Sequence, residues 1–534
     1  MSGQGLRYRS FPNLYKDSVT LMQLAARLRA RAGIDEASCV MATPANLAQL
    51  QHANLAVDAD VHPSDLLVVV RGDGTACDEA IEAAASLLEG TAAGKSGQSS
   101  GAFSLPVTSI AAAVESTPDA DLALISVPGE YAAAEAMKAL SLGLHVMLFS
   151  DNVSIDEERS VKRHAEDRGL LVMGPDCGTA IINGIPLGFA NVVRRGSIGL
   201  VAASGTGLQE VTCRIHNRGA GVSQAIGTGG RDLHEEIGGL TMRAALRALG
   251  DDNATEVIVL ISKPPAAIVA SQVLALAAAS RKPTVVHFLG AAAGSVRGEK
   301  LHAADSLAEA ADIAVALAKA HGSSTSAPST ARGKGEAAHA GGSRAASELD
   351  GLAPTQRSVR GLFTGGTFCY EAQLAFLRRN LPCRSNAPAP GAAAVDGSMS
   401  GHVFIDMGDD EYTRGRPHPM IDPSLRNAAI RDAGHDPTIA ILLFDVVLGF
   451  GAHPSPADEL ADALRDAQRT AAANGRKLVA IGHVCGTDGD PQDRAAQLRT
   501  LAAGGARVAD SNIEAASLAA ELAAALAERT AKSP

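Results

Sequence analysis

The sequence predicts a multidomain α/β protein with parallel sheets, preceded by a small α+β unit. The chain has 534 residues, which at ~100 to 200 residues per domain corresponds to three or four domains. Short apolar runs alternate with helical segments over most of the length, and this alternation requires crossover connections and parallel strands. Residues 322–357 are rich in Gly, Ser, Ala and Pro without apolar periodicity, so we expect a flexible linker there.

The N-terminal unit, residues 1–95, has the pattern of a small α+β fold of ferredoxin-like type. The next unit, residues 100–195, follows a Gly/Ser-rich break and has the strand and helix alternation of a Rossmann-like domain. The expected strands of these two units are 6–11, 37–42, 65–72, 121–127, 145–150 and 170–174, and the expected helices are 17–33, 77–90, 130–143 and 155–169. Alternatively, the first 195 residues form one domain, in which the strand near Val68 would join the sheet of residues 122–126.

Two further α/β units, of flavodoxin-like pattern, are expected at residues 196–321 and 358–530. Their expected strands are 197–204, 221–230, 255–262, 282–290, 360–366, 402–408, 438–449 and 477–484, and their expected helices include 207–219, 305–320, 370–380 and 456–475.

Composition excludes several classes of function. Aromatic residues make up 3% of the chain and Trp is absent, so stacking platforms for single-stranded nucleic acid are not expected. Lys and Arg number 47 against 58 Asp and Glu, a net charge of -11, which has the wrong sign for a phosphate-backbone binder. No apolar run of about 18 residues and no signal-peptide core are found, so we expect a cytoplasmic protein without membrane contact. The seven cysteines form no CxxC pair, which argues against a zinc site or a disulfide framework.

The sharpest local signal is GLVAASGTGLQE, in which an apolar strand runs directly into a glycine-rich turn and a helix. Bare N–H groups at a helix N-terminus favour an anion, and glycine allows its close approach. The fourth unit repeats the pattern as GLFTGGTFCYE, in which Gly366 follows Gly205 and Glu371 follows Glu210 by 161 residues. The candidate phosphate-binding residues are Ser204, Gly205, Thr206, Gly207, Gly365, Gly366 and Thr367. A tight turn with Ser or Thr as helix N-cap is the structural alternative.

The strands that follow the two loops end in AIGTGGRD and FIDMGDDE, which place Asp232 and Asp406 at the carboxyl ends of parallel strands. Open α/β sheets bind ligands at these ends. A Pro- and Gly-bounded loop at residues 413–419 adds Arg416 and His418, which suit a carboxylate or phosphate, although a solvated basic loop is equally compatible. We take these four residues as candidates for substrate binding.

Three weaker candidates have structural alternatives. Asp406, Asp409 and Asp410 could bind Mg²⁺, but helix capping is favoured, and we predict no metal site. Cys177 in GPDCG is expected to be a structural thiol, because no neighbouring base is identifiable. His453 is a weak candidate for a loop acid or base.

The run ALISVPGEYAAAEAMKALSLGLHVMLFSDNVS, with LLVMGPDCGTAI and GSIGLVAASGTG, resembles the α subunit of succinyl-CoA synthetase. The resemblance implies a CoA-binding domain at residues 100–195 and a ligase domain at 196–321, whose Ser-Gly-Thr helix grips phosphate. The fourth unit resembles the ligase domain of the β subunit. A more specific set of motifs spans nearly the whole chain and resembles the FdrA family: YKDSVTLM, ATPANLAQL, LLVMGPDCGT, ASGTGLQE, GGRDL, SKPPA, GRPHPMIDPSLR and LFDVVLGFGAHP.

The sequence departs from succinyl-CoA synthetase at the phosphohistidine. Where that enzyme has Gly-His-Ala-Gly, this chain has GAAAGSVRGEKLHAAD, with residues 291–293 all alanine. His302 is a poor phosphocarrier candidate because it precedes an exposed-looking helix start, and His287 alternates within a strand. The chain has no ATP-grasp domain and no Gly-rich CoA-cradling turn after residues 38–43. We therefore predict no phosphohistidine intermediate and doubt a complete acid–thiol ligase cycle.

The FdrA resemblance implies a subunit of an oxamate carbamoyltransferase of bacterial allantoin catabolism, working with two other proteins. Its substrates would be carbamoyl phosphate and oxamate, no cofactor is certain, and the chain would form a hetero-oligomer or a homodimer. The runner-up is an NDP-forming acyl-CoA synthetase that uses CoA and ATP or ADP with Mg²⁺ and borrows a nucleotide domain from a partner, and the third hypothesis is a scaffold. We expect the two Gly/Thr loops to converge on one site; the catalytic acid or base is not identifiable from the sequence.

Overall fold

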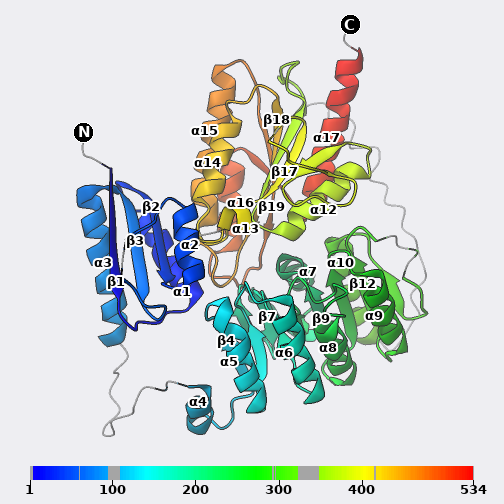
Figure 1. The fold of residues 1–534 in the computed structure, drawn as a ribbon. Helices are drawn as coiled ribbons and strands as arrows, with labels where there is room; N and C mark the ends of the chain where they lie inside the picture. The colour runs from blue at the N-terminus through cyan, green and yellow to red at the C-terminus, as the bar shows by residue number, and fades with distance from the viewer. Residues whose placement is uncertain are drawn as a thin grey trace.

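The computed structural model describes residues 4–532 apart from residues 59, 94–106, 108, 292, 293, 295, 323–347, 398, 414 and 415. Four sheets organise the chain, two with three strands and two with seven. In Figure 1 the N-terminal unit lies beside the other three, and the two seven-stranded units lie one above the other. Within the described part of the chain, no helix has the length and apolar character needed to cross a membrane.

The N-terminal unit is a three-stranded antiparallel sheet in the order β1-β3-β2, with helices around it. Its elements are β1 (Gln4–Phe11), α1 (Ser18–Arg29), β2 (Ile34–Met41), α2 (Pro44–His52), β3 (Leu66–Asp73) and α3 (Gly74–Ala93). Helix α2 is not among the helices expected from the sequence. Its start signal is nonetheless present, because the Thr43 side chain caps the helix and Pro44 stands at its first position.

The second unit has a three-stranded parallel sheet in the order β4-β5-β6. Its elements are α4 (Ile110–Ser116), β4 (Leu122–Ile125), α5 (Gly129–Ser141), β5 (His145–Leu148), α6 (Ile155–Asp167) and β6 (Val172–Met173). In the structure β3 pairs with β1 and β2, and β4 pairs with β5. The first 195 residues therefore do not share one sheet, which the alternative arrangement would require.

The third unit is a seven-stranded sheet in the order β13-β12-β11-β9-β10-β7-β8. Its elements are β7 (Thr179–Ile182), β8 (Ile185–Gly188), β9 (Arg195–Ala203), α7 (Gly205–Asn217), β10 (Val222–Gly227), α8 (Leu240–Asp251), β11 (Val257–Ser262), α9 (Ala267–Ala279), β12 (Thr284–Phe288), β13 (Leu301–Ala303) and α10 (Leu307–Gly322). The antiparallel hairpin β7–β8 belongs to this sheet through the pairing of β7 with β10. The sheet thus begins before residue 196, where the sequence pattern predicts the start of the domain.

The fourth unit is a seven-stranded sheet in the order β16-β15-β17-β14-β18-β19-β20. Its elements are β14 (Ser358–Phe363), α12 (Gly366–Leu377), β15 (Cys383–Ser385), β16 (Ala393–Ala394), β17 (His402–Asp406), α13 (Asp410–Thr413), α14 (Ser424–Ala433), β18 (Ile439–Val447), α15 (Pro456–Ala473), β19 (Val479–Cys485), α16 (Arg494–Ala503), β20 (Ala506–Ala509) and α17 (Asn512–Lys532). Read in the opposite direction, the five strands β20-β19-β18-β14-β17 match β13-β12-β11-β9-β10 of the third unit, with β14 in the central position of β9. The remaining two strands differ, because β15 and β16 join their sheet in parallel whereas β7 and β8 form an antiparallel hairpin.

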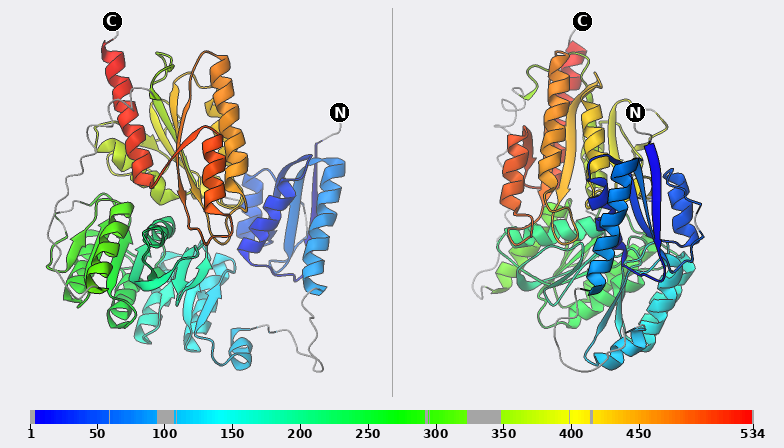
Figure 2. Two further views of the ribbon diagram at one scale, coloured as in Figure 1. Left: turned by 180° about the vertical axis from the view of Figure 1, so that it is seen from behind. Right: turned by 90° about the vertical axis from the view of Figure 1, so that its left-hand side faces the viewer.

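The two seven-stranded units share one hydrophobic core. A single cluster of buried side chains includes residues from β9, α7 and α10 of one unit and from β14, α12 and α17 of the other. Helices α7 and α12 contact each other, and α10 contacts α17. Helices α7, α10 and α12 lie where the two units meet, and α17 runs from there along the fourth unit towards the C-terminus (Figures 1 and 2). The N-termini of α7 and α12 are therefore held in one interface.

The expected linker lies mostly outside the described residues, and the described residues 348–357 pack on the fourth unit. Gln356 is buried, and its side-chain amide donates to the carbonyl groups of Ile439 and Lys477. Leu349 belongs to the shared core. The end of the segment is thus part of the domain, because its buried polar group is satisfied by a carbonyl of β18 and by one just before β19.

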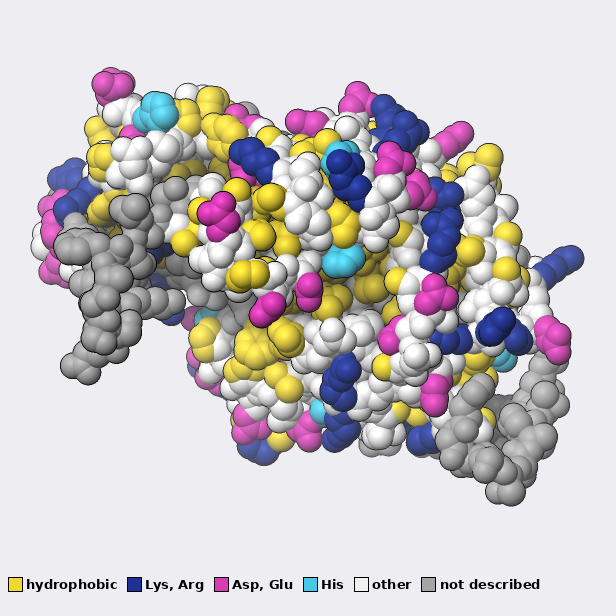
Figure 3. Space-filling view, turned by 90° about the horizontal axis from the view of Figure 1, so that it is seen from below, with side chains coloured by type: hydrophobic (Ala, Val, Ile, Leu, Met, Phe, Trp, Pro, Cys, Tyr) yellow, Lys and Arg dark blue, Asp and Glu magenta, His cyan; other side chains and the backbone are white. Residues whose placement is uncertain are grey.

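Acidic and basic side chains are interspersed on the face shown in Figure 3. A phosphate-backbone binder needs an extended positive surface. This face does not provide one, in agreement with the negative net charge of the chain.

Candidate functional site

The two glycine-rich loops meet in the interface between the seven-stranded units. Ser204 caps α7, since its Oγ accepts a hydrogen bond from the Gly207 N–H at 3.0 Å. The same Oγ lies 2.6 Å from Oγ1 of Thr367 in the first turn of α12. The helices therefore begin side by side, although their starting residues are more than 160 positions apart in the chain.

The N-terminus of α7 can be reached from solvent. Gly205 is exposed, and Ser204 and Thr206 are half-buried. A Cβ added to Gly205 would meet only Oγ1 of Thr179, at 3.5 Å. Because the first N–H groups of a helix have no partner within the helix, this end offers donors and a fractional positive charge to an anion.

The N-terminus of α12 is held by a buried carboxylate. Asp445 accepts hydrogen bonds from the Thr364 N–H at 2.7 Å and the Gly365 N–H at 2.9 Å. The Arg426 guanidinium lies 3.7 Å from this carboxylate and donates to its main-chain carbonyl. Burial raises the pKa of Asp445, and Arg426 opposes the rise. This network fixes the loop and partly neutralises the helix dipole.

A second carboxylate, Asp406, lies directly against the same helix end. A Cβ on Gly366 would overlap Oδ2 of Asp406, so only glycine permits this approach. Oδ1 accepts the Gly408 N–H at 3.0 Å. Burial raises the pKa of Asp406 to about 6, and the positive charge of Lys263 acts in the opposite direction. Near neutral pH this carboxyl is thus close to its titration range and can accept a proton.

More charged groups surround the place where the loops meet. Asp176 follows the cis peptide bond Gly174–Pro175, and its pKa is raised to about 6 by burial and by Asp151 and Asp410, against the charges of Arg231 and Lys263. Lys263 is exposed at the end of β11, next to β9. Lys263, Asp176 and Asp151 were not among the candidates from the sequence. Asp406 was identified because it lies at the carboxyl end of a parallel strand. The same criterion could have identified these three residues, since Lys263, for example, directly follows a parallel strand.

The four substrate-binding candidates occupy different places. His418 lies beside Asp406, because its Nε2 is 2.7 Å from the position of a Cβ on Gly408, and burial lowers its pKa to about 4. Arg416 contacts Glu36 of the N-terminal unit at 3.1 Å. It lines a cavity of about 260 Å³ between that unit and the start of α5. The structure therefore keeps His418 and Asp406 together and places Arg416 at a neighbouring cavity.

Asp232 is fully buried, and its carboxylate is engaged in holding the fold. It accepts hydrogen bonds from Lys162 at 2.8 Å and from the N–H groups of Thr241 and Met242 at the start of α8. No substrate can reach it without breaking these bonds. Asp232 therefore has a structural role in this fold, and its assignment to substrate binding stays a prediction.

Of the two histidines considered as phosphocarriers, His302 lies away from the two loops and His287 is held inside the sheet. His302 is on the edge strand β13 and, through the strand register, level with Leu200, four residues before Ser204. Three strand spacings separate it from β9, roughly 14 Å. His287 is buried in β12, with Nδ1 2.8 Å from the Ala304 carbonyl. Of the three alanines that replace the family's histidine loop, two lie outside the described residues.

The remaining candidates have local roles. Cys177 is buried against the carbonyls of Thr179 and Gly227, and burial raises the pKa of its thiol to about 12, so it is a structural thiol. His453 accepts the Ser455 N–H through Nδ1. Asp409 accepts the Glu411 N–H, which is a capping contact. Among the described residues, no group of three or more His, Cys, Asp or Glu is arranged to hold a metal ion.

Three family models match the chain. They are described as "AllF, heavy metal-associated domain" over residues 5–103, "CoA binding domain" over residues 193–290 and "CoA-ligase" over residues 362–522. The CoA binding domain model thus falls on the third unit rather than on residues 100–195. The chain has a fold of CoA-binding and ligase domains with a small N-terminal α+β unit.

The solved structures that the chain matches include the dinucleotide forming acetyl-coenzyme A synthetase 1 of Ca. Korarchaeum cryptofilum. It is 16% identical with a TM-score of 0.29, over 79% of this chain and 87% of that chain. The ATP citrate lyase of Methanothrix soehngenii is 15% identical with a TM-score of 0.33, over 42% of this chain and 43% of that chain.

Sequence relatives divide into two groups. The succinate–CoA ligase [ADP-forming] subunit alpha 2 of Archaeoglobus fulgidus is 28% identical over 27% of this chain and 50% of its own length. The Aquifex aeolicus subunit alpha is 29% identical over 27% of this chain and 48% of its own length. The protein YahF of Escherichia coli (strain K12) is instead 41% identical over 515 residues, which are 96% of this chain and 97% of YahF. With this full-length identity and the AllF domain model at its N-terminus, the chain belongs to the FdrA family.

Proposed function

We propose that this protein is a subunit that binds an acyl phosphate where α7 and α12 meet, and that it transfers the carbamoyl group between carbamoyl phosphate and oxamate. The observation that carries the proposal is the contact between Ser204 Oγ and Thr367 Oγ1 at 2.6 Å, which joins the two helix N-termini. The start of α7 offers N–H donors and a fractional positive charge to the dianionic leaving group, and the contact places the start of α12 beside it.

The charges around the contact indicate which end holds the phosphate. Asp445 and Asp406 already place two carboxyl groups at the start of α12. The exposed start of α7 has Lys263 on the adjacent strand instead. We therefore assign the phosphate to α7 and Lys263, and we assign the acceptor substrate to the side of Asp406 and His418.

The reaction needs positioning and one proton acceptor. The oxamate nitrogen attacks the carbamoyl carbon, the bond from that carbon to the phosphate oxygen breaks, and phosphate leaves with the bonding electrons. The nitrogen loses a proton in the same process, and Asp406 is the group assigned to accept it. The location of His302 away from the loops and the burial of His287 in β12 support direct transfer without a phosphohistidine.

An acid–thiol ligase that acts with a nucleotide-binding partner is the second candidate. The matches to the CoA binding domain and CoA-ligase models favour it. In that case CoA and ATP or ADP with Mg²⁺ would be required, and the two helix ends would bind the phosphate of a different acyl phosphate.

One set of incubations separates the two candidates. The chain, alone and with candidate partner subunits, is given carbamoyl phosphate with oxamate, or ATP with CoA and carboxylic acids. We expect phosphate release that depends on oxamate and formation of the carbamoylated product. CoA-dependent release of ADP would contradict the proposal and support the ligase. If no combination of partners yields either activity, both enzymatic proposals fail and a scaffold role remains.

A further inference from the structure

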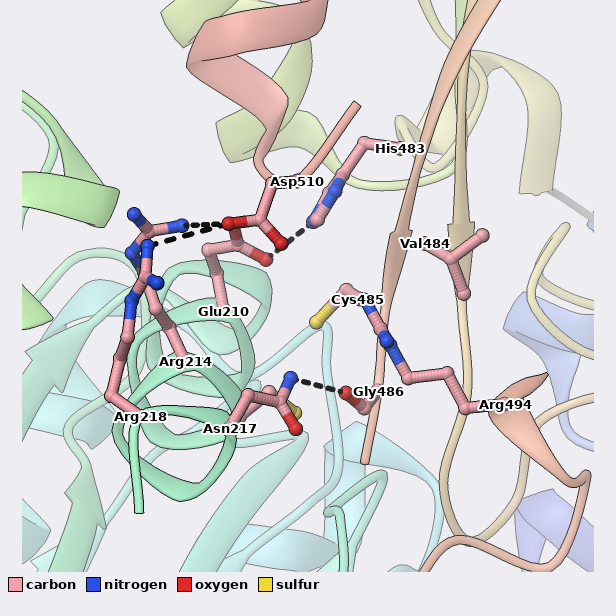
Figure 4. Close-up of a pocket in the computed structure, with 11 residues that line it drawn as sticks. Glu210, Arg214, Asn217, Arg218, His483, Val484, Cys485, Gly486, Arg494 and Asp510 are labelled. Carbon is pink, nitrogen blue, oxygen red and sulfur yellow. Dashed lines mark hydrogen bonds and ion pairs between the residues drawn. The ribbon is translucent and has the colours of Figure 1, made fainter. Parts of the chain in front are cut away.

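A second polar cavity lies in the interface between the seven-stranded units, along the length of α7 and apart from its N-terminus. Its volume is about 60 Å³. Figure 4 shows side chains from α7 on one side and from the end of β19 and the start of α16 on the other. A cavity of this size has room for about four water molecules, or one ion of about five non-hydrogen atoms.

Most charged groups that line this cavity are already paired. Arg214 makes two hydrogen bonds to Asp312, at 3.0 and 2.8 Å, and lies 3.5 Å from Asp510. Arg218 contacts the same two carboxylates. These carboxylates compensate the positive charges of Arg214 and Arg218, so the α7 side of the cavity does not need a further anion.

The buried pair Glu210 and His483 forms another wall of the cavity. Glu210 Oε2 lies 2.7 Å from His483 Nε2, and both side chains are nearly inaccessible to solvent. The charge of Glu210 raises the pKa of His483, although burial has the opposite and larger single effect. When both groups are ionised, the charges of the imidazolium and the carboxylate offset each other.

Arg494 differs from these groups. In the part of the chain that the structure describes, its guanidinium has neither an ion pair nor a hydrogen bond, and its Nε is inaccessible to solvent without a partner. An N–H group removed from water without a partner costs free energy, and a guanidinium is suited to two parallel bonds with an oxyanion. The cavity therefore has one cationic group whose anion is not supplied by the protein.

The fold does not require a charged lining at this position. On α12, the positions equivalent to Cys213 and Arg214 of α7 are Leu374 and Ala375, given the offset of 161 residues. Ala375 is buried in the shared core, and Leu374 packs against it. The same helix packing can thus be made with apolar side chains, and the polar groups along α7 need a different explanation.

We propose that this interface cavity binds one small oxyanion, of carboxylate or monobasic phosphate type, with Arg494 as its main ligand. The anion would connect α16 of the fourth unit to α7 of the third. Binding would therefore stabilise the domain contact that also holds Ser204 against Thr367. The proposal does not depend on which reaction takes place at the two loops.

The test uses selenate, an oxyanion of phosphate size whose position can be read from anomalous scattering. Crystals of the full chain are soaked in selenate, and the experiment is repeated with Arg494→Gln and with the matched control Arg499→Gln. Arg499 lies on the same helix and is exposed outside the cavity. Position-specific density separates this cavity from the α7 N-terminus, which binds anions under the proposed function.

We expect a selenate peak within hydrogen-bond distance of the Arg494 guanidinium in the wild type and in Arg499→Gln, and no peak in Arg494→Gln. In calorimetric titrations with inorganic phosphate at constant ionic strength, Arg494→Gln should weaken the corresponding site by at least about tenfold. Competition by phosphate or by acetate would then tell the two ligand types apart. A wild type without the peak, or a peak that persists in Arg494→Gln, would overturn the proposal.

A second variant covers the case in which Arg494→Gln does not fold. Arg494→Lys keeps the positive charge and loses the planar fork. It should fold and bind selenate with clearly lower occupancy. Equal occupancy in Arg494→Lys would show that the guanidinium does not hold the anion.

Discussion

At the scale of single residues, the site depends on carboxyl groups whose proton affinity is shifted by burial. Asp406 and Asp176 both have a pKa raised to about 6, and desolvation is the largest cause in each case. At a pH near 6, such a carboxyl group is only partly ionised, whereas an unperturbed aspartate is fully charged. It is suited to accept a proton near neutral pH, and it also destabilises the fold when it is charged.

The first prediction concerns the activity of Asp406→Asn. Asparagine keeps the shape and cannot accept the proton, so we expect carbamoyl transfer to fall about 100-fold or more. In the wild type, the rate at low pH should rise with an apparent pKa near 6, because the deprotonated carboxylate is the active form. The variant should lose this rise. An unchanged pH profile in Asp406→Asn, measured between pH 5 and 8, would exclude Asp406 as the proton acceptor.

The second prediction concerns the stability of the same variant. Because the pKa of Asp406 is higher in the folded than in the unfolded chain, the folded state binds more protons between about pH 4 and pH 6. The free energy of unfolding therefore decreases as the pH rises through that interval. Asp406→Asn should remove this loss and be more stable at pH 7, by about 1 to 3 kcal/mol. Urea unfolding at pH 4 and pH 7 measures the difference in free energy of unfolding between Asp406→Asn and the wild type. This difference should disappear at the lower pH.

At the scale of helices and strands, the two glycine-rich loops repeat one sequence pattern but differ in whether a side chain can replace their glycine. Gly366 cannot accept a side chain because Asp406 lies against it, whereas the Cβ position of Gly205 is almost free. One glycine is thus needed by the fold, and the other leaves a helix end open to a ligand.

The third prediction follows from the open position of Gly205. Gly205→Val should leave the free energy of unfolding within about 1 kcal/mol of the wild type, since no packed neighbour is displaced. It should nevertheless abolish phosphate binding and transferase activity, because the side chain covers the N–H groups of α7. Gly250→Val in α8 is the control, as its Cβ would also meet no neighbour. Equal phosphate binding by both variants would contradict the assignment of the phosphate to α7.

At the scale of the whole molecule, the pair Glu210 and His483 joins the third unit to the fourth across their common core. Its members come from α7 and β19, and both are buried. Breaking a buried pair leaves an uncompensated charge, which typically costs about 3 to 5 kcal/mol. The contact therefore contributes to the alignment of the two helix ends.

The fourth prediction is a pH dependence of this domain contact. The pKa of His483 is raised in the folded chain, so its contribution to stability is complete below the unfolded value of 6.5 and is lost as the pH rises through the folded value. The wild type should lose stability on going from neutral to alkaline pH, and His483→Gln should lose less. A double-mutant cycle with Glu210→Gln measures the coupling. A coupling near zero at neutral pH would show that the two groups do not interact as an ion pair.

The sequence by itself determined the class of fold and the two loops. Apolar periodicity and turn residues act over a few positions, so the alternation of strands and helices was visible in the chain, and with it the strand ends that carry Ser204 and Asp406. The hairpin β7–β8 was not predicted, and its place in the sheet depends on a pairing with β10 that no local pattern encodes.

Only the tertiary structure decided which side chains share the site. It placed Asp406 against Gly366, Glu210 next to His483 and Lys263 beside the loops, and it left Asp232 inside a buried ion pair. These contacts join residues from different strands and units. They are set by the packing of two sheets around one core, and strand and helix periodicity specify which residues face inward, not which of them meet.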